Sequence, residues 1–173
     1  MEFSQVLFSR CACRSYTDTP VTDEQLQTVL NAANAAPVGM GAYGTVHLTV
    51  IRNREFLADL SKATCEFMNR EGDPLYGAPV RVLDSAKPGM PPTIEFQITG
   101  TIMENMMLAA TDIGLGSVYL MGAIAALKTK PELVAQLALP EGFVPIAAAA
   151  LGHPAQSAAL REPQQKIETA YLN

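Results

Sequence analysis

A chain of 173 residues with 49% hydrophobic and 17% charged side chains is long enough to bury one sizeable core and has the composition of a folded globular protein. A net charge of −5 removes the positive footprint that a general nucleic-acid-binding protein needs. The longest uncharged run, residues 142–160, is broken by two prolines, and the N-terminus lacks the apolar stretch of a signal peptide. We therefore expect a cytoplasmic protein with no nucleic-acid or membrane partner.

Helical spacing predicts a short helix over residues 3–9 and a stronger one over 22–35. Thr22 and Gln25 form a capping-box pattern at the start of the second helix, and Pro37 ends it. Beyond a glycine-rich loop, the alternating β-branched residues of 45–51 predict a strand, and the pattern becomes helical again over 54–70.

The second half of the chain predicts a long core helix over residues 93–113, whose middle is apolar on most faces. The remaining predicted elements are strands at 80–83, 117–120 and 143–151 and a short helix at 131–137. This order lacks a regular βαβ rhythm, so an α+β sandwich around a central sheet fits better than a doubly wound fold. The apolar residues near the C-terminus, from Ile167 to Leu172, need another surface to cover them.

The segment Gly39–Gly44 matches the dinucleotide fingerprint GxGxxG letter for letter. That fingerprint works only when a strand precedes the glycines and a helix follows them, because the helix N-terminus receives the pyrophosphate. Here a helix precedes and a strand follows. The sequence therefore predicts no dinucleotide-binding fold.

Cysteine and histidine provide no visible catalytic or metal-binding arrangement. Cys11, Cys13 and Cys65 are an odd number without metal-site spacing, and we expect free thiols. His47 lies on a predicted strand and His153 in a loop, without a Ser, Asp or metal-ligand partner evident in the sequence. We expect His47 to be a partly buried structural residue and His153 to be a loop residue without a chemical role, and we expect neither a metal site nor a catalytic side chain.

Four local patterns follow one another along nearly the whole chain. They are Arg10-Cys11-Ala12-Cys13-Arg14-Ser15-Tyr16; Ala36-Pro37-Val38-Gly39-Met40-Gly41; Gly77–Val80 joined to Glu104–Ala110 and Ile113–Ser117; and Leu151-Gly152-His153-Pro154 with Arg161 downstream. In this order they resemble the nitroreductase-like family of FMN-dependent oxidoreductases. The resemblance implies a nitroreductase-like α/β sandwich of the α+β class, with a central mixed, mainly antiparallel sheet flanked by helices. It further implies an intertwined homodimer of one-domain subunits, residues 1–173, in which residues 158–173 are an extension packed on the partner subunit.

The same resemblance implies FMN between the two subunits. Arg10, Arg14 and Arg161 would hold the phosphate, because paired guanidinium groups suit a dianion. The backbone of 37–41 would run along the flavin ring, and a backbone N–H of 119–122 would hydrogen-bond the flavin N5. The implied cofactor-binding residues are Arg10, Cys11, Ala12, Arg14, Pro37, Val38, Gly39, Met40, Gly41, Asn105, Tyr119, Leu120, Met121, Gly122 and Arg161.

The implied activity is electron transfer from NADH or NADPH, through the flavin, to a small oxidised acceptor such as a nitroaromatic, quinone or enone in a ping-pong cycle. Departures from the family pattern keep two alternatives open. Cys11 and Ala12 stand where a second Arg and a Ser are usual, and Gly41 replaces an Asn. A flavin-sequestering protein with little turnover is one alternative, and a flavin-free interaction protein on the same scaffold is the other.

Overall fold

The computed structural model describes residues 1–172. Its regular elements are, in chain order, α1 (Phe3–Ser9), α2 (Asp23–Asn34), two 3-10 turns η1 (Gly39–Gly41) and η2 (Tyr43–Thr45), β1 (Val46–Ile51), α3 (Arg54–Met68), β2 (Val80–Ala86), α4 (Ile94–Asp112), β3 (Gly116–Leu120), α5 (Gly122–Lys128), α6 (Pro131–Gln136) and β4 (Val144–Gly152). None of the described helices is both long and apolar enough to cross a bilayer.

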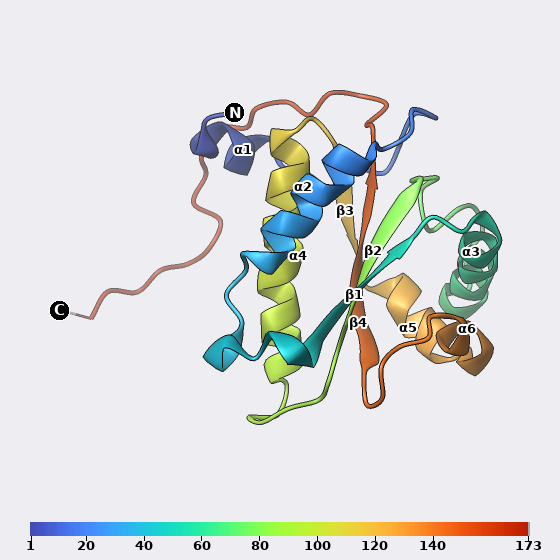
Figure 1. Cartoon of the computed structure of the whole chain (residues 1–173). Helices are drawn as coiled ribbons and strands as arrows, with labels where there is room; N and C mark the ends of the chain where they lie inside the picture. The colour runs from blue at the N-terminus through green and yellow to red at the C-terminus, as the bar shows by residue number, and fades with distance from the viewer. Residues whose placement is uncertain (173) are drawn as a thin grey trace.

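The four strands form one sheet in the order β1-β2-β4-β3, and all three neighbouring pairs are antiparallel. Val82 of β2 lies opposite Val50 of β1 and Ala149 of β4. Helices α2 and α4 lie on one side of the sheet, and α3, α5 and α6 lie on the other (Figure 1). The predicted α+β sandwich with helices on both sides of a mainly antiparallel sheet is confirmed. The described parallel pairing is a single bridge between Ala12 and Ser117.

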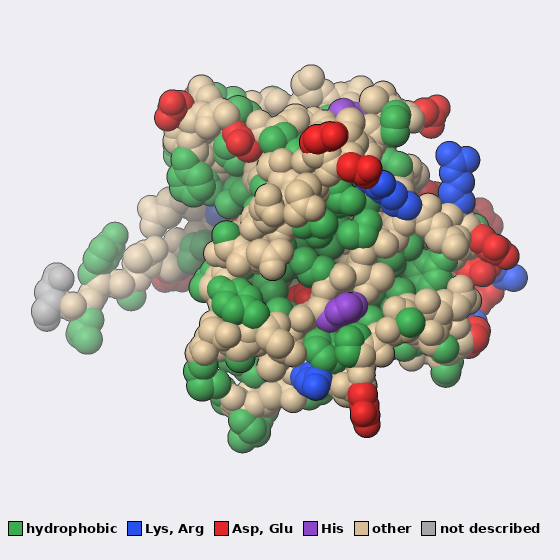
Figure 2. Space-filling model, in the orientation of Figure 1, with side chains coloured by type: hydrophobic (Ala, Val, Ile, Leu, Met, Phe, Trp, Pro, Cys, Tyr) green, Lys and Arg blue, Asp and Glu red, His purple; other side chains and the backbone are tan. Residues whose placement is uncertain are grey.

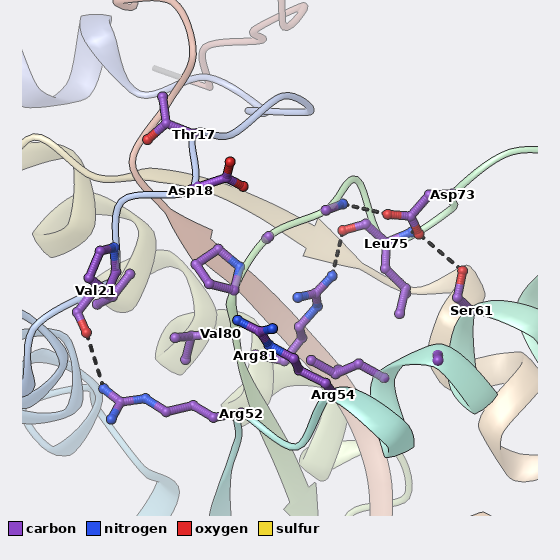
Figure 3. A pocket seen from close by; sticks show the side chains of 16 residues that line it. Thr17, Asp18, Val21, Arg52, Arg54, Ser61, Asp73, Leu75, Val80 and Arg81 are labelled. Carbon is purple, nitrogen blue, oxygen red and sulfur yellow. Dashed lines mark hydrogen bonds between the residues drawn. The ribbon is translucent and has the colours of Figure 1, made fainter.

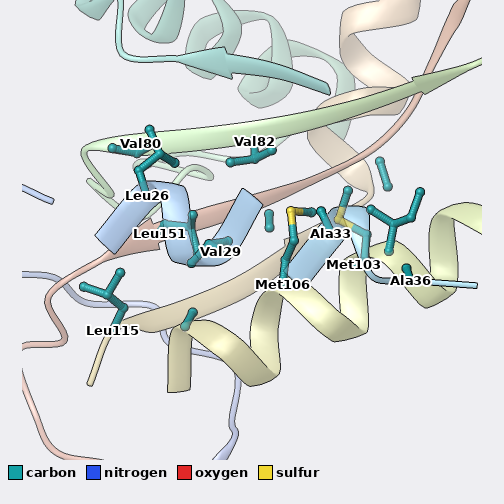
Figure 4. Packing of buried hydrophobic residues seen from close by; sticks show 14 of the residues in the cluster. Leu26, Val29, Ala33, Ala36, Val80, Val82, Met103, Met106, Leu115 and Leu151 are labelled. Carbon is teal, nitrogen blue, oxygen red and sulfur yellow. The ribbon is translucent and has the colours of Figure 1, made fainter. Parts of the chain in front are cut away.

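Helix α2 begins where its sequence predicts. The Thr22 hydroxyl accepts a hydrogen bond from the Gln25 backbone N–H at 3.2 Å, and the Gln25 side-chain oxygen accepts one from the Thr22 N–H at 3.0 Å. This reciprocal pair satisfies two N–H groups that a helix start otherwise leaves without partners. The apolar stripe of Leu26, Val29 and Ala33 then packs on α4 and the sheet (Figure 4).

Helix α4 is a core helix, as predicted, because it buries apolar residues on most of its circumference. Met103 and Met106 have no exposed area and fill the layer between α2 and the sheet. One stripe remains open to solvent, along Phe96, Gly100 and Glu104. The opposite layer of the sandwich is a second core, in which Phe56, Leu60, Leu83, Ile124 and Leu127 pack α3 and α5 on the far side of the sheet.

Two element predictions need correction. Helix α5, Gly122–Lys128, was not predicted, because its small and apolar residues carry little amphipathic signal. Strand β2 runs on to Ala86, three residues beyond its predicted end at Leu83, because Asp84 and Ser85 are polar and yet continue the pairing with β1 and β4.

The C-terminal segment, residues 158–172, leaves the body of the protein in an extended conformation and belongs to no helix or β-strand (Figure 1). Hydrophobic side chains are exposed along this tail and around the end of the molecule that holds residues 37–45 (Figure 2). Ile167 is 80% exposed and Tyr171 84% exposed, so the tail does lack an apolar surface within its own subunit. Asn173, the last residue of the predicted extension, lies outside the described residues.

Candidate functional site

The segment Arg10–Tyr16 is held against the sheet rather than hanging free after α1. Ala12 bridges to Ser117 of β3, and the Cys13 N–H donates to the Ser117 carbonyl at 2.8 Å. The Tyr16 hydroxyl donates to the Cys13 carbonyl at 2.9 Å, which closes the segment on itself. Burial raises the pKa of this phenol, so Tyr16 remains a hydrogen-bond donor at physiological pH.

Two glycines allow this close contact. A Cβ on Gly116 would lie 2.6 Å from the Cys13 Sγ, and a Cβ on Gly152 would lie 2.7 Å from the Tyr16 ring and from Pro79. Contacts this short are below van der Waals distance, so larger residues would push the Arg10–Tyr16 segment away from β3 and β4.

The three predicted phosphate-binding arginines lie near this segment, in different settings. Arg161 donates to the carbonyls of Phe8 at 3.0 Å and Arg10 at 2.6 Å, so its guanidinium closes the C-terminal end of α1. The Arg10 side chain lies 3.7 Å from the Glu104 carboxylate of α4. The Arg14 guanidinium stacks over the Tyr76 ring, 5.8 Å from its centroid. The structure thus brings the Arg161 guanidinium to the backbone of Arg10, while the three guanidinium groups point to different partners.

A cavity of about 560 Å³ opens beside this segment. It is lined by Cys11–Ser15 and by residues 114–117 of the turn before β3 and its first residues, with Gln156–Ala159 at its edge. Its volume lies within the range of small-molecule sites, roughly 300 to 1,000 Å³. Cys13, Gly116 and Ser117 belong to this lining and were not among the predicted site residues.

The predicted N5 segment lies at the other end of the same strand. Tyr119 and Leu120 end β3, Met121 is 71% exposed, and Gly122 begins α5. A Cβ on Gly122 would lie 3.0 Å from the Met68 sulfur at the end of α3. Met68 therefore borders the N5 segment, a proximity that a separation of 54 residues in the chain concealed. Ser117 and Leu120 are roughly 10 Å apart at the usual rise of a strand.

Residues 37–41 lie elsewhere. Pro37 accepts a hydrogen bond from the Thr101 hydroxyl at 3.1 Å, so this loop sits against the N-terminal half of α4. The tip of the loop lies at the start of α4, where a Cβ on Gly39 would be 3.8 Å from the Ile94 side chain. Cys11–Ser15 share a cavity with Thr111 near the other end of the helix, although the Arg10 side chain reaches back to Glu104. Met40 is 95% exposed at φ 57°, and Gly41 also has a positive φ of 65°. Helix α2 precedes the glycines and β1 follows them, in the order that excludes a dinucleotide-binding fingerprint.

Asn105 and the two histidines have partners within the subunit. The Asn105 side chain donates to the Ala32 carbonyl at 3.1 Å and ties α4 to α2. His47 faces the Phe143 ring edge-on at 6.0 Å, and the His153 carbonyl accepts the Thr17 N–H at 2.9 Å. The three cysteines are free thiols, as predicted.

One charged residue of the sheet was missed by the sequence analysis. Asp84 of β2 is fully buried on the α4 side, and neither of its carboxylate oxygens has a hydrogen-bond partner among the described residues. Burial raises the pKa of Asp84 to about 6, and the neighbouring Thr99 hydroxyl, outside hydrogen-bonding geometry, offsets only part of that effect. Burial and the Asp84 charge together raise the pKa of Tyr119, which connects this carboxyl electrostatically to the N5 segment.

Comparison with known proteins identifies the family to which this chain belongs. The family model described as Nitroreductase family matches residues 7–94. A relative from Archaeoglobus fulgidus, provisionally named NADH dehydrogenase/NAD(P)H nitroreductase, is 30% identical over 88% of this chain and 86% of its own length. A Bacillus subtilis FMN reductase [NAD(P)H] is 29% identical over 92% of this chain and 70% of its own length.

Solved structures agree in fold. A nitroreductase from Desulfitobacterium hafniense with bound FMN superposes with a TM-score of 0.85 at 24% identity, over 99% of this chain and all of that chain. A nitroreductase from Bacteroides fragilis with bound FMN gives 0.82 at 26% identity, over 100% of this chain and 99% of that chain. By the match to its family model and by its full-length relatives, the chain belongs to the nitroreductase family.

Proposed function

We propose that the protein is an NAD(P)H-dependent flavin oxidoreductase that binds FMN between two subunits and reduces a small oxidised acceptor. The proposal depends mainly on one observation: the predicted phosphate-binding segment and the predicted N5 segment lie at the two ends of strand β3. β3 fixes the Arg10–Arg14 segment at its first residues and is followed directly by the exposed Met121 and by Gly122, the first residue of α5. An extended ribityl phosphate can bridge that separation. The FMN carried by the structural relatives and the flavin reductase names of the curated relatives support it.

The residues present fit FMN in charge and shape. Arg14 lines the 560 Å³ cavity, and Arg10 precedes the lining residue Cys11, so two guanidinium groups could turn toward a phosphate bound there. When bound, FMN supplies hydride acceptance at N5 and electron donation to the acceptor. The chain contributes position and electrostatics: a backbone N–H at Met121 or Gly122 to orient N5, and an open side on which donor and acceptor follow one another.

A second subunit would complete the binding site around the flavin ring. The tip of the 37–41 loop lies beside Ile94 at the start of α4, and Cys11–Ser15 share a cavity with Thr111 near its end, about 26 Å further along the helix. An FMN whose phosphate lies in that cavity would therefore meet the loop tip of the partner subunit rather than that of its own. In a homodimer built on α4, the loop of one subunit would lie on the flavin held by the other, and the tail from residue 158 onward would find its apolar surface on the partner.

The open stripe of α4 supplies the dimer test. Gly100 lies at its centre, and a Cβ added there meets no atom within 4 Å in the subunit. We expect Gly100→Arg to fold and to sediment as a monomer with FMN lost, because the long side chain keeps two α4 helices apart. Ala125→Arg, at an exposed position of α5 on the other layer, is the matched control and should remain dimeric. A Gly100→Arg protein that remains a dimer would place the interface elsewhere.

The activity test is the visible spectrum of protein purified without added cofactor. A yellow protein whose flavin absorbance bleaches on anaerobic addition of NADH or NADPH, and returns on addition of a quinone or nitroaromatic, is the expected result. A colourless protein that ignores added FMN would contradict the proposal.

A second candidate function is flavin sequestration with little turnover. It is favoured by the hydrogen bonds that occupy Arg161 with backbone carbonyls and by Cys11 and Ala12, which offer no cation or hydroxyl to a phosphate. The same spectrum distinguishes it, because a sequestering protein would be yellow and would not bleach with either nucleotide.

A further inference from the structure

A second cavity is larger than the one beside the Arg10 segment. It has a volume of about 850 Å³ and lies between the loop before α2, the first turns of α3 and the start of β2. Its apolar wall is formed by Pro20, Val21, Leu57, Leu75, Pro79 and Val80. None of the predicted flavin-binding residues lines it, so its chemistry is separate from the proposed function.

Arg81 lies in the lining of this cavity and is only 3% exposed. One of its amino groups, Nη2, donates to the Leu75 carbonyl at 2.6 Å (Figure 3). Its Nε and Nη1 are buried and have no hydrogen-bond partner among the described residues. A buried cation with free donors is costly, because both desolvation and the missing hydrogen bonds count against it. Burial accordingly lowers the pKa of Arg81.

Asp73 is the carboxylate whose charge acts on Arg81, but these two described side chains form no ion pair. Asp73 is instead occupied by the Ser61 hydroxyl at 3.0 Å and by backbone N–H groups of Leu75 and Gly77 (Figure 3). Arg54, at the first position of α3, projects toward the same cavity and makes no ion pair within residues 1–172 (Figure 3). Arg52 is already paired with Asp23 at 2.8 Å.

We infer that this cavity is a binding site for an organic acid, whose carboxylate pairs with the Arg81 guanidinium while its apolar body lies against Pro20, Val21 and Leu57. A planar carboxylate matches the free donors of a guanidinium better than a spherical anion does. Arg54 at the rim adds positive charge, and Asp18 and Asp73 leave the lining with a net charge of +1 from three arginines and two aspartates. The apolar wall gives no advantage to an inorganic anion.

The test is titration calorimetry of the full-length protein, with the cofactor it carries, using sodium benzoate as the probe. Benzamide, the neutral analogue, and inorganic phosphate are titrated in parallel. The expected result is saturable binding of benzoate, at least about tenfold weaker binding of benzamide and phosphate, and an unchanged visible spectrum. No binding of benzoate, or phosphate bound as tightly as benzoate, overturns the inference.

Two variants locate the binding. Arg81→Leu removes the cation and should bind benzoate at least about tenfold more weakly while remaining folded, because an unpaired buried charge is replaced by an apolar side chain. Ala58→Trp fills the cavity from an exposed position of α3 without touching Arg81, and should also abolish binding. Ala125→Trp, outside the cavity, should bind as the unaltered protein does. Benzoate binding that persists in Ala58→Trp lies at another site and overturns the inference.

Discussion

Replacing Asp84 by Asn is expected to stabilise the protein by about 2 to 3 kcal/mol at pH 7.5, an unusual sign for a change to a fully buried polar residue. The pKa of Asp84 rises from its ordinary value of 3.8 to about 6 on folding, and each unit corresponds to about 1.4 kcal/mol. Above pH 6 the folded protein must bury a charge that the unfolded chain leaves in water, and the amide removes that cost without changing the shape of the side chain.

The pH dependence separates this cause from a packing effect. Because the folded state holds the proton more tightly, the stabilisation that protonation provides is fully present below pH 3.8 and is lost as the pH rises through about 6. Denaturant unfolding at fixed protein concentration, from pH 4 to 8, should therefore show the gain of Asp84→Asn shrinking toward pH 4. Asp59→Asn, at an exposed position of α3, should change stability by a few tenths of a kcal/mol. A gain independent of pH would refute the account.

Gly116→Ala is expected to lower stability by about 2 to 3 kcal/mol and to weaken FMN binding at least about tenfold, although it adds only one methyl group. The new Cβ would lie 2.6 Å from the Cys13 Sγ and 2.9 Å from the Cys13 Cβ. Rotation of the Cys13 side chain moves the sulfur but not the Cβ, so the backbone of the Arg10–Tyr16 segment must shift away from β3. Thermal unfolding and a flavin-binding titration measure the two effects.

The control for this change is Gly44→Ala, because a Cβ on Gly44 meets no atom within 4 Å. Adding Cys13→Gly to Gly116→Ala removes both close atoms of Cys13 and should restore FMN binding in part, leaving only the Pro154 contact at 3.2 Å. Undiminished FMN binding in Gly116→Ala would mean that the Arg10–Tyr16 segment does not hold the cofactor.

The helices and strands with strong periodicity were predictable from the sequence. Thr22 and Gln25 announce the start of α2 because a capping box satisfies backbone donors locally, with no help from the rest of the fold. Helix α5 was not predictable in the same way. Its residues are small or apolar on nearly every face, and it forms because α3 and the sheet bury it.

The sequence motifs nominated sets of residues for the candidate site, but they could not predict how those sets assemble in space. The motif positions indicated Arg10 and Arg161, but their proximity depends on a tail that returns to α1 after 151 residues. Arg81 and Asp84 interrupt an otherwise apolar strand sequence, and this interruption was the only sign in the sequence that β2 carries buried charged residues. Arg81 lies within the predicted strand of 80–83, which stopped before Asp84 because a run of polar residues normally indicates the end of a strand. Both side chains are instead buried in the sheet.

The placement of the 37–41 loop tip and of Cys11–Ser15 at opposite ends of α4 has a genetic consequence. In the proposed dimer, each active site is composed of the Arg10 segment from one chain and the 37–41 loop from the other. A chain defective in the first region and a chain defective in the second can therefore complement each other. Their heterodimer holds one site with both lesions and one site with neither, so one of its two sites is active although each allele alone is inactive.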